Sequence, residues 1–472
     1  MNLEGTQLLV VGLGRSGMAV ARFAAARKAI VTANDARPES ELLPEISELR
    51  GAGIAVVAGS HPDSVFSRAD LIVLSPGVPS DLGPIQAARR LGKKIVGEAE
   101  FASWFLRGSV IGITGSNGKT TTTSLAGALM SSAGKDVLVG GNIGVPLTSL
   151  VEQSTDSTWT VAELSSFQLE NIERLRVNVA VVTNITPDHL DRHASFDEYC
   201  AAKQNIFLNQ VAGDWAVLNG DDRVVVKIAD GVPPGNKIYF SSSGSPVSGS
   251  ASIYLRGGAI IGRFESGAGD RQEAETEIIR TDEIPLLGLH NIENVMAAAG
   301  ATICAIGPAA VNMEAIRTAI RQFKGVEHRI EFVAEISGIK FYNDSKATNV
   351  DSTAKALEAF AGNIILILGG KDKGSDYTRL APLIADRVKL IVLIGAAADK
   401  IAGQLNGSAP MVRASSMDDA LARASEAGVA GDVVLLAPAC ASFDMFSNYE
   451  HRGRVFKDAV LNLARGEGAL EV

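Results

Sequence analysis

The chain has 472 residues, of which 46% are hydrophobic and 21% are charged. This balance supplies apolar mass for several cores, about three at roughly 150 residues per domain, and excludes a disordered chain or a coiled coil. Lys and Arg number 44 against 53 Asp and Glu, so the net charge is −9, which argues against a nucleic-acid partner because such proteins need a cationic surface.

The cysteines lie far apart and form no CxxC pair, which favours reduced thiols over disulfides or a zinc site (Cys200, Cys304 and Cys440). No apolar run approaches the ~18 residues that a membrane span needs. Glu4 stands where a signal peptide would be basic. We therefore expect a cytoplasmic protein without a membrane partner.

The first block alternates short buried strands with Gly or Asp turns and amphipathic helices. Its strands are rich in Val and Ile without polar alternation, as expected for strands covered on both faces. They are predicted at 7–12, 29–35, 53–59, 69–77 and 93–97, with helices at 15–28 and 41–50. This order predicts a parallel, doubly wound sheet.

A linker at 97–109 leads to a second strand–loop–helix start, and further strands are predicted at 137–141, 158–164, 179–185 and 215–222. The Gly/Ser-rich stretch 241–270 is typical of short antiparallel hairpins, which predicts a small antiparallel sheet. Two helices follow, at 291–306 and 313–323.

The pattern then restarts with a hairpin at 328–344 and strands at 364–370, 390–395 and 432–438. We predict an α/β fold of three domains. They are a Rossmann-like domain at 1–98, a central P-loop ATPase-type domain at 99–325, and a second Rossmann-like domain at 326–472.

The first glycine motif, GLGRSG at 12–17, follows a strand and opens a helix, and Asp35 ends the next strand. Such glycines let a pyrophosphate approach the backbone at the helix N-terminus, and the acid reaches a ribose hydroxyl. The motif indicates an anionic, nucleotide-like ligand. NAD, another nucleotide and a ligand-free tight turn are all compatible with it.

A second phosphate motif, TGSNGKT at 114–120, also lies between a strand and a helix. Successive N–H groups and the helix dipole cradle phosphates, Lys119 neutralises their charge, and Thr120 offers a hydroxyl to Mg²⁺. Ile113 stands where the strict P-loop has glycine, so this is a shortened variant.

Acidic and imidazole side chains follow two later strands. Glu163 ends an apolar strand, at the sheet edge where P-loop enzymes hold Mg²⁺. The loop 184–193 carries Asp188, His189, Asp191 and His193, which could ligate a metal, exchange protons, or cap the following helix.

Four segments, TGSNGKTTTT at 114–123, HNIEN at 290–294, EHRIE at 327–331 and NDSKATN at 343–349, resemble the Mur ligases of peptidoglycan synthesis. ELSSFQLE at 163–170, TNITPDHLDRH at 183–193 and PACASFDMFSNYEHRG at 438–453 are similar to the members that add D-glutamate. The resemblance covers essentially the whole chain. It implies an ATP-dependent ligase whose N-terminal domain holds a UDP-linked substrate instead of NAD.

The resemblance also implies ATP as co-substrate and two Mg²⁺ ions. The implied catalytic residues are Lys119, His189, Lys203 and Arg329. ATP would be bound by Gly115, Ser116, Asn117, Gly118, Lys119, Thr120, Thr121, Asn294, Arg329 and Asp344. The implied metal ligands are Thr120, Glu163, His189 and Lys203 as a carbamate, which turns an ammonium into an anionic oxygen donor.

The implied substrates are UDP-N-acetylmuramoyl-L-alanine and D-glutamate, bound by a monomer. The first would contact Gly14, Arg15, Ser16, Asp35, Arg37, Ser75, Pro76, Gly77, Asn142, Ser165, Gln168 and His189. D-glutamate would contact Lys346, Thr348, Lys373, Ser442 and Tyr449. Lys371 is an alternative to Lys373, and Tyr449 stands where the family often has Phe.

In the implied reaction, the L-alanyl carboxylate attacks the γ-phosphate of ATP, and the amine of D-glutamate then attacks the acyl phosphate. A folylpolyglutamate synthase would share the P-loop but needs no GxGxxG domain before it. A dehydrogenase would have no use for the GKT loop, and a non-catalytic nucleotide-binding regulator is a third alternative.

Overall fold

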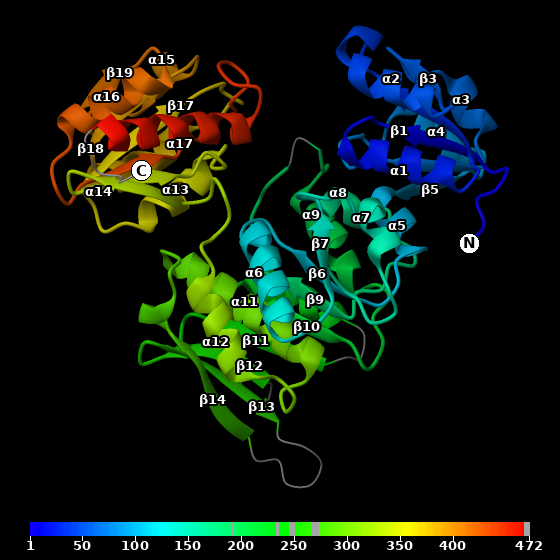
Figure 1. Cartoon of the computed structure of the whole chain (residues 1–472), viewed down its shortest axis with the longest axis horizontal. Helices are drawn as coiled ribbons and strands as arrows, with labels where there is room; N and C mark the ends of the chain where they lie inside the picture. Colours follow the sequence, from blue (N-terminus) through cyan, green and yellow to red (C-terminus); the bar gives the residue numbers. More distant parts are fainter. Residues whose placement is uncertain (190–191, 233–235, 245–250, 266–272, 467–472) are drawn as a thin grey trace. The chain divides into compact units, whose positions relative to one another are not determined.

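The computed structural model describes residues 1–189, 192–232, 236–244, 251–265 and 273–466 (Figure 1). The chain divides into two compact units, Met1–Glu283 with Glu293–Arg321, and Ile284–Ile292 with Gln322–Val472. Across the described ranges the strands form three sheets, of five, nine and six strands. No helix within these ranges is long and apolar enough to cross a membrane.

The first sheet is parallel throughout, in the order β3-β2-β1-β4-β5. Alternate residues of β1 enter separate apolar clusters, Leu8 and Val10 in one and Leu9 and Val11 in the other, so both faces are covered. The predicted doubly wound sheet is therefore confirmed. Its strands are β1 (Gln7–Val11), β2 (Ile30–Asp35), β3 (Ala55–Ala58), β4 (Leu71–Leu74) and β5 (Lys94–Gly97).

The helices that accompany this sheet differ from the predicted ones at some of their ends. They are α1 (Arg15–Ala26), α2 (Leu43–Gly51), α3 (Asp63–Arg68), α4 (Gly83–Arg90) and α5 (Glu98–Ser103). Helix α1 ends before the predicted Lys28, which has a left-handed φ of 63°. Helix α2 starts later than predicted, with a proline in its first turn. The predicted linker 97–109 contains α5, whose buried Glu100 accepts N–H bonds from residues 173–175.

The second sheet runs β14-β13-β12-β11-β10-β9-β6-β8-β7. The predicted antiparallel strands are present as the pairs β12–β13 and β13–β14. Strand β12 pairs in parallel with β11, so the antiparallel strands extend the main sheet. The pairing of β12 with β11 joins separate segments of the chain and therefore leaves no local sequence signal. The strands are β6 (Ser109–Thr114), β7 (Val137–Gly141), β8 (Trp159–Glu163), β9 (Val179–Val182), β10 (Trp215–Asn219), β11 (Asn236–Ser241), β12 (Ala251–Arg256), β13 (Ala259–Glu265) and β14 (Glu273–Arg280).

Helix α6 follows β6 after the short loop 115–118 and packs on β7 and β8 (Figure 1). The parallel strands β6, β8 and β9 are neighbours, so the loops that leave their carboxyl ends meet at one edge. The other helices are α7 (Leu147–Leu150), α8 (Ser166–Leu169), α9 (Phe196–Gln204), α10 (Arg223–Ile228), α11 (Leu289–Ile306) and α12 (Met313–Gln322), with α6 at Lys119–Ser132.

The third sheet has the order β15-β16-β20-β17-β18-β19, and the predicted hairpin is its antiparallel pair β15–β16. Strand β17 places Ile365 and Ile367 in one apolar cluster and Leu366 and Leu368 in another. Helices therefore cover both faces, as in the first sheet. Its elements are β15 (Glu331–Ile336), β16 (Ile339–Asn343), β17 (Ile364–Gly369), β18 (Val388–Ile394), β19 (Met411–Arg413), β20 (Val433–Leu436), α13 (Val350–Glu358), α14 (Ala381–Arg387), α15 (Ala398–Gln404), α16 (Met417–Ala427) and α17 (Tyr449–Gly466).

Candidate active site

The phosphate loop joins β6 to α6 and depends on two glycines. Gly115 has φ +148°, and a Cβ there would lie 2.0 Å from Thr183 Oγ1. Gly118 has φ +82°, and a Cβ there would lie 2.2 Å from Asn294 Oδ1. Neither position therefore accommodates a side chain without displacing a neighbour. The backbone of the loop is held close to β9 and α11.

The Lys119 ammonium closes this loop. Its Nζ donates to the carbonyls of Gly115 and Ser116, each at 2.9 Å. The Ser116 hydroxyl donates to Thr186 O and shares a 2.9 Å hydrogen bond with the Tyr199 hydroxyl. These contacts fix the Lys119 ammonium at the start of a 14-residue helix, where a cation and the helix dipole both favour phosphate oxygens.

Glu163 ends β8, opposite Ile113 at the end of β6. Its side chain is buried, and Oε1 accepts a 2.9 Å hydrogen bond from Asn142 Nδ2. Oε2 is buried and has no hydrogen-bond partner in the described part of the chain. A buried carboxylate oxygen with an open coordination position fits a hard cation such as Mg²⁺.

Lys203 lies on α9 with a side chain that is only 1% exposed. Its Nζ donates to Gly115 O at 2.8 Å and lies 4.6 Å from the centre of the Tyr199 ring. Burial and the nearby Lys119 ammonium lower the pKa of Lys203 well below its usual value. The predicted catalytic lysines thus share the carbonyl of Gly115.

His189 and His193 both contact the ring of Phe167. His189 has φ +54° and an edge-to-face contact with Phe167 at 5.1 Å, while His193 stacks on the same ring at 5.3 Å. His193 Nε2 lies 3.0 Å from the hydroxyl of Ser166, and burial lowers the pKa of His193. Asp191, the fourth side chain named for this loop, lies outside the described residues.

Acidic, cysteine and histidine side chains do not by themselves complete a metal site: no cluster of three or more such residues is found where the chain is described. A Mg²⁺ ion near Glu163 would have to take its other oxygens from hydroxyl groups, ATP phosphates or water. Thr120, at the start of α6, is buried and belongs to the same loop.

A cavity of about 470 Å³ lies at the carboxyl edge of the first sheet. Asp35 holds two other lining residues in place: its carboxylate accepts hydrogen bonds from the Leu13 amide at 2.7 Å and from Arg37 at 2.9 to 3.1 Å. Burial raises the pKa of Asp35, but these hydrogen bonds outweigh it and leave the pKa below its usual value. The predicted residues that line the cavity are Gly14, Arg15, Ser16, Asp35, Arg37, Ser75, Pro76, Gly77 and Asn142.

Three residues predicted for the same substrate do not line this cavity. Ser165 and Gln168 form a capping box at α8, with Ser165 N donating to Gln168 Oε1 at 3.0 Å. His189 lies with Phe167 instead. Conversely, His61 lines the cavity and lies 2.6 Å from Asn34 Oδ1, although the sequence analysis did not single it out. Its place just after a predicted strand was the signal that could have found it.

Arg329 and Asp344 are neighbours in the second compact unit. Arg329 Nε is buried and has no hydrogen-bond partner within the described ranges. Burial raises the pKa of Asp344 to about 6, even though the Arg329 charge opposes the shift. Asn294 and the phosphate loop belong to the first unit, so the residues predicted for ATP are divided between the units.

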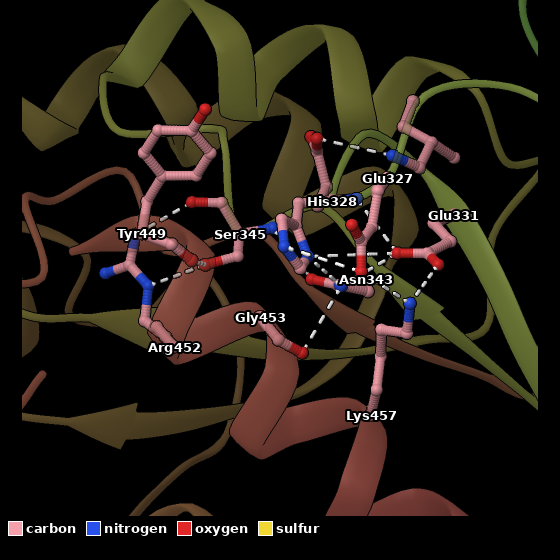
Figure 2. A network of polar contacts seen from close by, with 11 residues as sticks. Glu327, His328, Glu331, Asn343, Ser345, Tyr449, Arg452, Gly453 and Lys457 are labelled. Atoms are coloured by element: carbon pink, nitrogen blue, oxygen red, sulfur yellow. Dashed lines mark hydrogen bonds and ion pairs between the residues drawn. The ribbon is translucent and has the colours of Figure 1, made fainter. Parts of the chain in front are cut away.

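Three of the residues predicted for D-glutamate lie on connected segments of the second unit. Lys346 Nζ is 5.8 Å from the centre of the Tyr449 ring, and Tyr449 O accepts a hydrogen bond from Ser345 Oγ (Figure 2). Ser442 is buried and follows Ala441, which pairs with Lys371 through two backbone hydrogen bonds. Thr348 is half-buried, whereas the Lys371 and Lys373 side chains are both exposed.

Family models match the chain in three places. They are described as "Mur ligase MurD-like, N-terminal domain" over 6–97, "Mur ligase middle domain" over 113–302, and "Mur ligase, glutamate ligase domain" over 328–440.

Two bacterial relatives are similar over nearly their whole length, and both are named UDP-N-acetylmuramoylalanine--D-glutamate ligase. The protein from Acidobacterium capsulatum is 52% identical over 98% of this chain and 97% of its own. The protein from Koribacter versatilis is 49% identical over 99% of this chain and 100% of its own.

Solved structures resemble the fold at lower identity. The UDP-N-acetylmuramate-alanine ligase of Thermotoga maritima matches with a TM-score of 0.58 at 19% identity, covering 97% of this chain and 100% of its own. A pseudomurein peptide ligase type C from Methanothermus fervidus matches with a TM-score of 0.56, also at 19% identity and with the same coverage.

Proposed function

The chain belongs to the Mur ligase family, and we propose that it adds D-glutamate to UDP-N-acetylmuramoyl-L-alanine, converting ATP to ADP and phosphate. The observation that carries this proposal is the 52% identity, over 98% of the chain, to a relative named for this reaction. Neither a dehydrogenase nor a folylpolyglutamate synthase has such support. We assign UDP binding to residues 1–98, ATP binding to 99–325, and the binding of D-glutamate and part of ATP to 326–472.

The phosphate loop is proposed to hold ATP. Lys119 supplies a fixed cation at the start of α6, where the helix dipole favours anions. The amides of Ser116 and Asn117 donate to Asn184 and fix the shape of the loop. The unpartnered Nε of Arg329 is suited to the transferring phosphoryl group. Asn294 and Asp344 are assigned to the adenosine part. Phosphoryl transfer depends mainly on positioning and charge neutralisation, which these residues supply.

Magnesium would be held by Glu163 and Thr120 beside the ATP phosphates, and a second ion by His189 and a carbamylated Lys203. Bound Mg²⁺ neutralises phosphate charge and polarises the transferring group. The position of Lys203 supports the proposal of a carbamate, because its side chain is only 1% exposed and its amine donates to Gly115 O in the phosphate loop. A carbamate there would place two anionic oxygens near Lys119 and relieve the repulsion between the two ammonium groups.

The UDP moiety is proposed to occupy the 470 Å³ cavity of the first sheet. Gly12 and Gly14 line it just before the start of α1, and Arg37 is fixed by Asp35 so that its remaining N–H groups can meet a phosphate or uracil oxygen. Asn142 lines this cavity and also binds Glu163, so it joins the nucleotide end of the substrate to the ATP site.

The chemistry follows in two steps. The L-alanyl carboxylate attacks the γ-phosphorus of ATP, a P–O bond to ADP breaks, and an acyl phosphate forms. The neutral amine of D-glutamate then attacks the carbonyl carbon, the acyl C–O bond to phosphate breaks, and the nitrogen releases a proton as the amide forms. The glutamate carries two carboxylates, which Lys346, Lys373 and the hydroxyls of Thr348 and Ser442 can bind.

An ADP-release assay tests the proposal with UDP-N-acetylmuramoyl-L-alanine and each enantiomer of glutamate. We expect release with D-glutamate, little with L-glutamate, and none from Lys119→Ala, while Lys135→Ala, an exposed lysine after α6, stays active. ADP release by Lys119→Ala within a few-fold of wild type would refute the ATP site. A preference for L-glutamate would refute the assigned substrate.

A further inference from the structure

Arg452 is the largest of the fully buried side chains, at 1% exposure on helix α17. Burial lowers the pKa of Arg452 to about 10, so the guanidinium stays protonated at neutral pH. Its hydrogen bonds go to a hydroxyl and to main-chain carbonyls, and no carboxylate in the described residues forms an ion pair with it. A buried charge without an ion pair costs stability, even though Asp444 attracts it from a longer distance, and this calls for a role other than packing.

The guanidinium connects segments that are far apart in the sequence. Nε donates to Ser345 Oγ at 2.9 Å and Nη2 donates to Ser345 O at 2.8 Å. Nη1 donates to Cys440 O at 3.2 Å and to Ala441 O at 3.4 Å. The Ser345 hydroxyl in turn donates to Tyr449 O at 2.8 Å, so Arg452 is linked to Tyr449 through Ser345 (Figure 2).

A fourth segment joins through Ala441, which exchanges backbone hydrogen bonds of 2.8 and 3.1 Å with Lys371. The approach is close: a Cβ on Gly370, whose φ is +137°, would lie 2.4 Å from Ala441 O and 3.2 Å from Arg452 Nη1. Each tied segment carries or adjoins a residue assigned to D-glutamate. These are Lys346 after Ser345, Ser442 after Ala441, Lys373 after Lys371, and Tyr449 itself.

We propose that Arg452 is a positioning residue for the amino-acid substrate: it locks these four segments into one pocket and adds a buried positive charge behind it. An arginine suits this position because its planar guanidinium has five N–H donors. It donates to the hydroxyl and carbonyl of Ser345 on one segment and to the carbonyls of Cys440 and Ala441 on another. The fixed charge favours a dicarboxylate over neutral amino acids. This inference rests on the proposed function, because it assigns the pocket to D-glutamate.

The test compares Arg452→Met with Arg454→Met, an exposed arginine two residues along the same helix. We expect Arg452→Met to raise the KM for D-glutamate by about tenfold or more, while the KM values for ATP and the UDP-linked substrate change less than about twofold. Arg454→Met should match wild type. An unchanged KM for D-glutamate, or an equal rise for all three substrates, would overturn the proposal.

Should Arg452→Met fail to fold, Arg452→Lys and Ser345→Ala make the same test. Lysine keeps the charge but not the fork, and we expect it to recover only part of the D-glutamate affinity. Ser345→Ala removes the relay to Tyr449 and should raise the same KM by about threefold or more. Wild-type KM in both variants would refute the positioning role. Failure of wild type to use D-glutamate would instead refute the proposed function.

Discussion

Gly118 and Asn294 are 176 positions apart in the numbering but face each other so closely that a Cβ on Gly118 would lie 2.2 Å from Asn294 Oδ1. The same Oδ1 accepts a 3.2 Å hydrogen bond from Thr122 Oγ1. The start of helix α6 and the second turn of α11 are therefore joined at the point where the phosphate loop ends.

This contact predicts that Gly118→Ala loses ATP binding, because the new methyl group displaces Asn294 from the loop. Gly134→Ala is the matched control, since Gly134 also has a positive φ of +75° but nothing within 4 Å of the added Cβ. Each alanine costs about 1 kcal/mol of backbone strain. Calorimetry with ATP should show at least a tenfold weaker affinity for Gly118→Ala alone. Equal affinities in the two variants would contradict the prediction.

Asp344→Asn should make the protein more stable and less active. Burial raises the pKa of Asp344 to about 6 in the folded state, above the usual 3.8, so ionisation at neutral pH destabilises the native state. The destabilisation is absent below pH 3.8, grows between pH 3.8 and 6, and is constant above, at a value on the order of 3 kcal/mol.

The melting temperature tests this directly. The gain in Tm from Asp344→Asn should be larger at pH 7.5 than at pH 5, whereas Asp458→Asn, an exposed residue on α17, should show no such difference. If Asp344 also binds the ribose of ATP, the stabilised variant loses ATP affinity. A Tm gain that is independent of pH would mean that Asp344 is not a buried ionising group.

Lys203→Ala should lower turnover by about 10²-fold or more while the protein stays folded, because a metal-binding carbamate would be lost. With ¹³C-bicarbonate, the wild-type protein should show a carbamate resonance in the carbon spectrum that Lys203→Ala lacks. Lys227→Ala, an exposed lysine on α10, serves as the control and should keep both activity and resonance. An active wild-type enzyme with no carbamate resonance would eliminate this role.

The cavity of the first sheet should bind UDP and ignore NAD. Arg37→Ala should weaken UDP by about tenfold, since it removes the cation that Asp35 holds in place. Arg22→Ala, in an exposed ion pair with Glu48 on α1 and α2, should leave UDP affinity unchanged. Calorimetric titration of both nucleotides measures this, and micromolar affinity for NAD with none for UDP would overturn the assignment.

Lys346→Ala and Ser442→Ala should each impair the use of D-glutamate. Loss of a cation or hydroxyl that faces a charged substrate costs on the order of 10²-fold in kcat/KM. Binding of the UDP-linked substrate, measured separately by calorimetry, should stay within about twofold. Lys340→Ala, an exposed lysine on β16, is the control. Unchanged KM and kcat for D-glutamate in both variants would place its pocket elsewhere.

Much of the fold could be predicted because its signals are local. Unalternating runs such as 364–370 identified strands covered on both faces, and the glycines at 12, 14, 115 and 118 marked the turns that leave them. The order of strand and helix predicted parallel sheets, since crossovers of this kind are right-handed and short. The local signal did not show that β12 pairs with β11 and so extends the main sheet.

The sequence by itself determined the strands, the phosphate loop and the family, because each of them is specified by short runs of neighbouring residues. Only the tertiary structure decided which distant groups meet. It placed His61 in the cavity with Arg37, Lys203 on the carbonyl of Gly115, and Arg452 on Ser345 and Ala441. Such meetings depend on the packing of whole elements, and burial then lowers the pKa of Lys203 and of Arg452, which no short segment encodes.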